Sequence, residues 1–174
     1  MAIRTAVVVS VTSFLLGALF THWIADSLTL WKSPVTDEHL WTAAGYYSIL
    51  SKTPQESIIA LCGVVGLGAL TITWSLRDGE AGNLMFDGSS LFLYGTAVVV
   101  YANSAIPNLR TKFLSIPTHD LTAACPPAIK RAALELASNH LMCSVALTGV
   151  LVLQAGRHWA ERSESGRTPA VQKP

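Results

Sequence analysis

Four long runs of apolar residues alternate with polar segments along this chain of 174 residues. The runs cover about residues 6–25, 57–76, 88–106 and 136–156, and within these limits none contains Asp, Glu, Lys or Arg. A helix needs about 20 mostly apolar residues to cross the hydrocarbon core of a bilayer. The pattern therefore predicts an all-α fold, a polytopic membrane protein with four transmembrane helices.

The first run has a second interpretation, a secretory signal peptide, because Arg4 precedes its apolar stretch. The run is longer than a typical signal core, and no clean A-x-A cleavage site follows it. A retained transmembrane helix is the favoured prediction.

The polar segment between the first two runs, residues 26–56, contains a shorter helical pattern, TDEHLWTAAGYYSIL. Thr36 can cap this helix, and Asp37 and Glu38 in its first turn favour the positive end of the helix dipole. The apolar positions at helical spacing are Leu40, Ala43, Tyr47 and Leu50. We expect a short amphipathic helix that lies on the membrane surface or packs on the bundle.

The remaining segments complete a simple organisation. Asp87 stands just before the third run and is predicted to be its N-cap. The segment 107–130 holds four prolines and is predicted to be irregular. We expect residues 1–159 to form the membrane domain and residues 160–174 to form a flexible polar tail.

Composition supports a membrane protein and excludes other classes. Hydrophobic residues make up 51% and charged residues 13% of the chain, and the mean hydropathy is +0.42; a soluble domain carries about 25% charged residues. A net charge of +1 and the lack of a basic cluster argue against a nucleic-acid partner. Six positive residues fall on each side of the predicted membrane, so charge does not orient the protein.

An enzyme would need titratable groups that converge, and no catalytic motif, metal-ligand spacing or phosphate loop occurs in the sequence. We therefore predict no catalytic residue, no metal and no cofactor. The alternative from another class is a small four-span membrane enzyme or a sterol- or lipid-binding protein, which requires His22, Asp87 and His140 to meet. A purely structural scaffold with four spans is a third alternative. A transporter is disfavoured because no charge lies within the four runs.

Small and polar residues within the runs are the candidate contact sites. Helices in lipid associate through close approach at small residues and through hydrogen bonds between helices. The candidates are Ser13, Gly17 and Thr21 at four-residue spacing in the first run, Asn103 late in the third, and His140, Ser144 and Gln154 along one stripe of the fourth. The stripe either packs inside the protein's own bundle or receives a helix from another protein.

Four stretches, in order, resemble one known family. They are SFLLGALF, EHLWTAAGYYSIL, NLMFDGSSLFLYGTAVVVYA and ALTGVLVLQAG. Together they look like the fungal endoplasmic-reticulum packaging chaperones for amino-acid permeases, the Shr-type family. The resemblance covers about residues 12–161.

The resemblance implies a resident membrane protein of the endoplasmic reticulum with four spans and both termini in the cytosol. Segments 26–56 and 107–130 would then lie in the lumen, so the amphipathic helix would belong to the first lumenal loop. It also implies an ATP-independent, client-specific chaperone that shields the transmembrane helices of new amino-acid permeases from aggregation. Family members have no catalytic residue and no cofactor.

The resemblance further links the C-terminal tail to the vesicle coat that exports folded permeases. The tail of this chain is short and weakly charged, and it ends in neither a KDEL signal nor a paired-lysine signal. The expected partners are therefore the helices of nascent amino-acid permeases, membrane lipid and, through the tail, coat components. The exposed small and polar faces are predicted to pair temporarily with client groups that are costly to leave unpaired in hydrocarbon.

Overall fold

A computed structural model describes residues 2–77, 81–116 and 123–165, and every regular element in these ranges is helical. The elements are α1 (Ala2–Thr21), α2 (Trp23–Leu30), α3 (Asp37–Ser51), α4 (Gln55–Leu76), α5 (Ala81–Val100), the π-helical η1 (Tyr101–Ala105), α6 (Ile106–Asn108), the π-helical η2 (Leu109–Phe113) and α7 (Pro127–Ser165). The all-α prediction is confirmed.

Four of the described helices are long and apolar enough to cross a membrane. These candidate spans are Ile3–Thr21, Gln55–Leu76, Leu84–Phe113 and Pro127–Ser163. The number of predicted spans is therefore confirmed. The third and fourth spans are longer than the apolar runs that predicted them, because the third span includes Asp87 and Pro107 and the fourth continues past Arg157.

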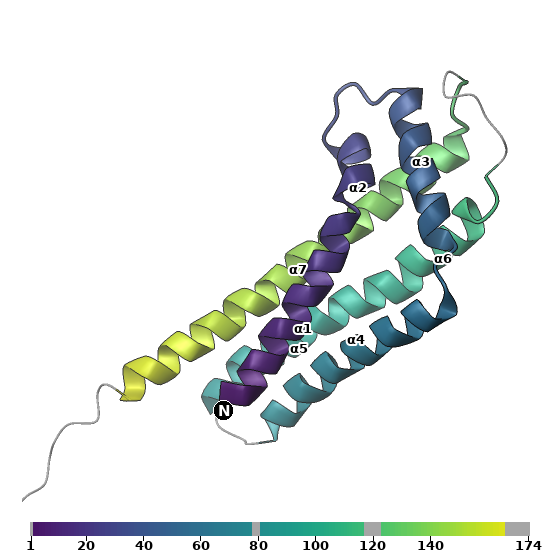
Figure 1. The fold of residues 1–174 in the computed structure, drawn as a ribbon. Coiled ribbons are helices and arrows are strands. Elements are labelled where there is room, and N and C mark those ends of the chain that lie inside the picture. The colour runs from purple at the N-terminus through teal and green to yellow at the C-terminus, as the bar shows by residue number, and fades with distance from the viewer. Residues whose placement is uncertain (1, 78–80, 117–122, 166–174) are drawn as a thin grey trace, which may run out of the picture.

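The bundle is organised around α7, which packs along α5 and α1, while α4 packs against α1 and α5 (Figure 1). The start of α1, the end of α4 and the end of α7 lie at one end of the bundle, as four spans require. Helices α2 and α3 lie at the other end, beside the first turns of α7 (Figure 1).

The short helix α3 packs on the bundle, one of the two predicted placements. Thr36 is its N-cap, as predicted, and the structure adds a capping box between Thr36 and His39. Leu40, Ala43 and Tyr47 are buried, whereas Leu50 is half-buried. The predicted apolar side of this helix therefore faces α2, η2 and α7.

Two predictions about the segments that flank the spans are wrong. Asp87 is not an N-cap, because α5 begins six residues earlier, at Ala81. The segment 107–130 is not irregular throughout, because helical structure continues to Phe113 and resumes at Pro127; residues 117–122 of this segment lie outside the described residues. Pro107 lies in α6 between two π-helical segments, where wider turns accommodate a ring that crowds an ordinary helix.

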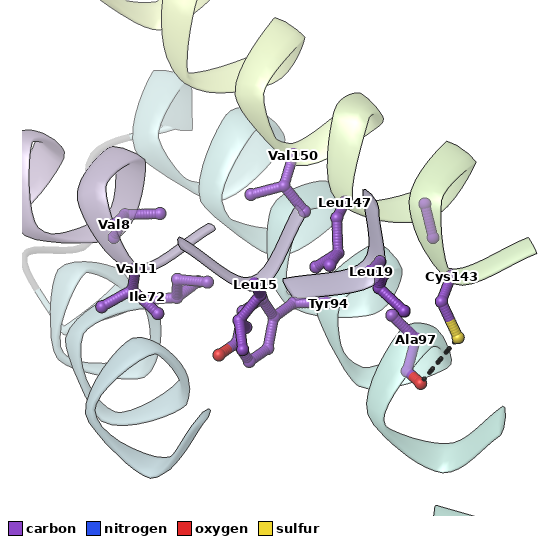
Figure 2. Packing of buried hydrophobic residues seen from close by; sticks show 11 residues of the cluster. Val8, Val11, Leu15, Leu19, Ile72, Tyr94, Ala97, Cys143, Leu147 and Val150 are labelled. Carbon is purple, nitrogen blue, oxygen red and sulfur yellow. Dashed lines mark hydrogen bonds between the residues drawn. The ribbon is translucent and has the colours of Figure 1, made fainter. Parts of the chain in front are cut away.

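The middle of the bundle is an apolar core formed by α1, α4, α5 and α7. Its labelled side chains in Figure 2 are Val8, Val11, Leu15, Leu19, Ile72, Tyr94, Ala97, Cys143, Leu147 and Val150. A Cβ atom at Gly68 would lie 2.5 Å from Tyr94 Oη and 2.9 Å from Val11 Cγ1. Glycine at this position therefore lets α4 approach α1 and α5 closely, as small residues do in membrane bundles.

Candidate functional site

Two clusters of buried and half-buried polar side chains lie on either side of this apolar core. The Asp26 cluster consists of His22, Asp26, Tyr46, Tyr47 and His140. The Asp87 cluster consists of Ser75, Asp87, Ser90, Gln154, Arg157 and Glu161. Polar groups in a membrane bundle are costly unless paired, so each cluster is a candidate site for function or assembly.

In the Asp26 cluster, the carboxylate of Asp26 joins three helices. The Tyr47 hydroxyl of α3 donates to Asp26 Oδ1 over 2.6 Å, and His140 Nδ1 of α7 lies 3.1 Å from both carboxylate oxygens. Asp26 is 5% exposed, His140 1% and Tyr47 0%. The carboxylate therefore fixes α2 to both α3 and α7.

His22 extends this cluster toward the end of α1. Its ring centroid lies 4.6 Å from that of His140, and its Nδ1 lies 2.9 Å from Tyr46 Oη. Burial and, to a smaller extent, the neighbouring His140 together lower the pKa of His22 from 6.5 to about 4, against an opposing effect of Asp26. Burial also raises the pKa of the Tyr47 hydroxyl, so this group keeps the proton that it donates.

In the Asp87 cluster, a buried ion pair joins α5 to α7. Arg157 Nη1 donates to Asp87 Oδ2 and, over 2.9 Å, to Ser75 Oγ of α4. Ser75 Oγ in turn donates to Asp87 Oδ2, and Gln154 Nε2 donates to Asp87 Oδ1 over 3.1 Å. Glu161 Oε1 accepts from Arg157 Nε over 2.9 Å. The Asp87 cluster thus connects α4, α5 and α7.

The charges of this cluster lie within candidate spans, which corrects the expectation that the spans are uncharged. Asp87 and Arg157 are 1% and 4% exposed. Removing one partner of a buried ion pair costs about 3–5 kcal/mol, because the other charge stays buried without compensation. The pair therefore holds the helices in one arrangement and permits few others.

The structure does not bring together His22, Asp87 and His140, the three residues named for the membrane-enzyme alternative. His22 and His140 are neighbours, but Asp87 belongs to the other cluster. His140 and Gln154, which bind Asp26 and Asp87, are 14 positions apart on α7, a separation of about 21 Å at 1.5 Å per residue. The predicted convergence required by that alternative is therefore wrong, and the described residues hold no group of three potential metal ligands.

Two grooves open on the sides of the bundle. The α1–α7 groove, of about 460 Å³, is lined by Leu16, Gly17, Leu19, Phe20, Trp23, Asp26, Leu30, Ala137, His140, Leu141 and Ser144. The α5–α7 groove, of about 840 Å³, is lined by Leu84, Met85, Gly88, Ser89, Phe92, Leu93, Thr148, Gly149, Val152 and Leu153. The first groove alone reaches residues of a buried polar cluster.

The candidate contact residues of α1 and the third span face outward. Ser13, Gly17, Thr21 and Asn103 are exposed, and Asn103 lies in the π-helical segment η1. Apart from its two chain neighbours and the nearby backbone of α1, no described atom lies within 4 Å of a Cβ atom built on Gly17. These four positions are therefore open to a neighbouring helix or to lipid.

The candidate residues of the α7 stripe lie inside the bundle or at its edge. His140 and Gln154 are buried and hydrogen-bonded within the Asp26 and Asp87 clusters. Ser144 is half-buried, donates to the His140 carbonyl and lines the α1–α7 groove. Two of the three stripe residues thus have partners within the protein.

The sequence patterns missed Asp26 and Arg157 and misplaced Asp87. Each of these residues stands immediately beside a predicted run, at positions where the runs end at 25 and 156 or begin at 88. The sequence shows only a charged residue directly beside an apolar run. This pattern is the same whether the residue contacts water or pairs with a residue on another helix.

The fold and its clusters define a class: a four-span helical membrane protein whose buried charges serve to join helices. Residues 1–174 match the SHR3 chaperone family, described as ER membrane protein SH3. The chain belongs to this family. It is also similar to the secretory component protein psh3 of Schizosaccharomyces pombe, with 24% identity over 159 residues that cover 89% of this chain and 68% of psh3. No solved structure matches.

Family membership places the chain in the membrane of the endoplasmic reticulum, with a chaperone and packaging role in the secretory pathway. It implies client membrane proteins as partners, and it implies that the protein is not an enzyme.

Proposed function

We propose that the protein is an ATP-independent, client-specific chaperone that shields the transmembrane helices of new amino-acid permeases from aggregation and supports their export to the plasma membrane. The family match over the whole chain carries this proposal. The open positions Ser13, Gly17, Thr21 and Asn103 support it, because they offer small and polar faces to an incoming helix.

The physical task of such a chaperone follows from the bilayer. A half-made permease exposes polar and small faces whose partners have not yet been inserted, and these groups are costly in hydrocarbon. Hydrogen bonds between membrane helices average about 0.6 kcal/mol, so each contact of this kind is weak enough to break and form again. A chaperone that uses them can release its client without ATP.

The proposal includes orientation and export. Both termini lie in the cytosol, α2 and α3 lie on the lumenal side, and residues 160–174 contact the vesicle coat. The structure extends α7 through Ser165, so residues 160–165 of this proposed tail are helical, and residues 166–174 lie outside the described residues.

The test is to delete the gene and image several tagged amino-acid permeases beside unrelated plasma-membrane proteins. We expect the permeases to stay in the endoplasmic reticulum while the control proteins reach the cell surface. Normal delivery of the permeases would reject the proposed clients, and retention of both groups would reject client specificity.

A further inference from the structure

We infer that the α1–α7 groove is the client-binding site, and that its occupant is a client transmembrane helix that presents a hydrogen-bonding side chain to the groove floor formed by Asp26 and His140. This inference rests on the proposed function and locates its contact surface.

The chemistry of the occupant follows from a polar atom in the groove floor. Among the described residues, no hydrogen-bond partner is present for His140 Nε2, although this atom is buried. His140 Nδ1 lies 3.1 Å from both carboxylate oxygens of Asp26, so Nε2 is the ring nitrogen that is left for a further hydrogen bond. A helix that carries a hydroxyl or amide side chain can form this hydrogen bond, because these groups both donate and accept, whereas an acyl chain cannot.

The walls of the groove suit a helix. Phe20 and Trp23 of the α1–α2 side are 73% and 45% exposed, and Ser144 lies on the α7 side. The α7 residues of the groove extend from Ala137 to Ser144, about 10 Å or two helical turns. This length matches one crossing contact between two helices.

Gly17 permits the backbone of a second helix to come close. A Cβ atom at this position would meet nothing within 4 Å, so packing inside the protein does not require the glycine. Ser13 and Thr21 lie one turn before and after Gly17 on the same side of α1, and both are exposed. Small residues at four-residue spacing are typical of surfaces where membrane helices cross.

The first experiment fills the groove. Gly17→Leu places a bulky side chain where a client would lie without displacing a described atom around its Cβ. Gly63→Leu is the matched control, because Gly63 is also exposed, a Cβ atom added there would also meet nothing within 4 Å, and the residue lines neither groove. Each variant replaces the natural protein in cells, and its own amount is measured together with the surface amount of an amino-acid permease.

We expect both variants to accumulate normally, and Gly17→Leu to lower permease delivery at least fivefold while Gly63→Leu leaves it unchanged. Equal delivery with both variants would overturn the inference. Should Gly17→Leu itself fail to accumulate, the second experiment decides.

The second experiment identifies the occupant by photocrosslinking. The aromatic crosslinker p-benzoylphenylalanine replaces Phe20 in the α1–α7 groove or Phe92 in the α5–α7 groove; both side chains are 73% exposed. The probe is a ribosome-bound permease fragment with its first membrane helices inserted into microsomes. We expect a permease adduct from position 20 and none from position 92.

Three results would overturn the inference: lipid adducts alone from position 20, equal permease adducts from both positions, or an adduct between two copies of this chain. If permeases depend on the gene and one of these results is obtained, the groove assignment fails and the proposed function stands. If permeases do not depend on the gene, the proposed function fails first.

Discussion

Two aspartates, Asp26 and Asp87, each connect three helices through hydrogen bonds that are almost inaccessible to water. A carboxylate in this setting is stabilised by its partners, and removing one partner lowers the stability of the folded protein substantially. The effect of a substitution therefore depends on whether the residue is a cluster member or an outward-facing position.

Arg157→Leu should destabilise the protein by about 3–5 kcal/mol, because it leaves Asp87 buried without its charged partner. The double variant Asp87→Leu, Arg157→Leu removes both charges and should recover most of this loss. Thermal unfolding in detergent provides the measurement. A single variant as stable as the natural protein would show that the ion pair does not hold α5 to α7.

The candidate contact residues should separate into two groups. His140→Leu should reduce the amount of folded protein, because Asp26 loses its contact with α7. Ser13→Leu and Asn103→Leu replace exposed side chains and should change the stability by no more than about 0.5 kcal/mol. Protein amounts and unfolding temperatures should be compared with permease delivery.

A client-contact role for Ser13 or Asn103 predicts a loss of delivery at normal protein amount. Loss of the protein itself after either of these two substitutions would contradict the exposed placement of their side chains. Unchanged delivery would remove that residue from the contact surface.

At the scale of helices, the existence of the elements could be predicted from the sequence better than their ends. Hydropathy identified the four spans and the periodicity of residues 36–50 identified α3, since both depend on local composition. The ends of α5 and α7 could not be found in this way. Asp87 and Arg157 are buried within these helices because they form an ion pair with each other. The two partners are 70 residues apart, so their pairing leaves no pattern in the sequence near either residue.

The cap of α3 offers a test at this scale. Thr36→Ala removes the capping hydroxyl and should cost about 1 kcal/mol. Tyr47 of α3 donates a hydrogen bond to Asp26 of α2. Fraying of the first turn of α3 should therefore increase hydrogen exchange in both helices. Thr42→Ala is the control, since its exposed hydroxyl bonds only to the preceding turn at Glu38. Faster exchange in the control than in Thr36→Ala would contradict this role of the cap.

For the whole molecule, the proposed orientation predicts which segments meet the lumenal glycosylation enzyme. Asp120→Asn creates the acceptor sequence Asn-Leu-Thr between the third and fourth spans, and Gly166→Asn creates Asn-Arg-Thr in the tail. We expect a mass increase that is sensitive to endoglycosidase for the first variant and none for the second. The reverse pattern would place both termini in the lumen.

The spacing of the charged partners along the chain also has a consequence for synthesis. Asp87 and Arg157 are 70 residues apart, and Asp26 and His140 are 114 apart. At about 5–20 residues per second, the ribosome takes roughly 4–14 s to proceed from Asp87 to Arg157, and roughly 6–23 s from Asp26 to His140. During this interval the newborn protein carries two carboxylates that still await their partners on the last helix. For its first seconds, the chaperone is therefore in the same condition as the clients proposed for it.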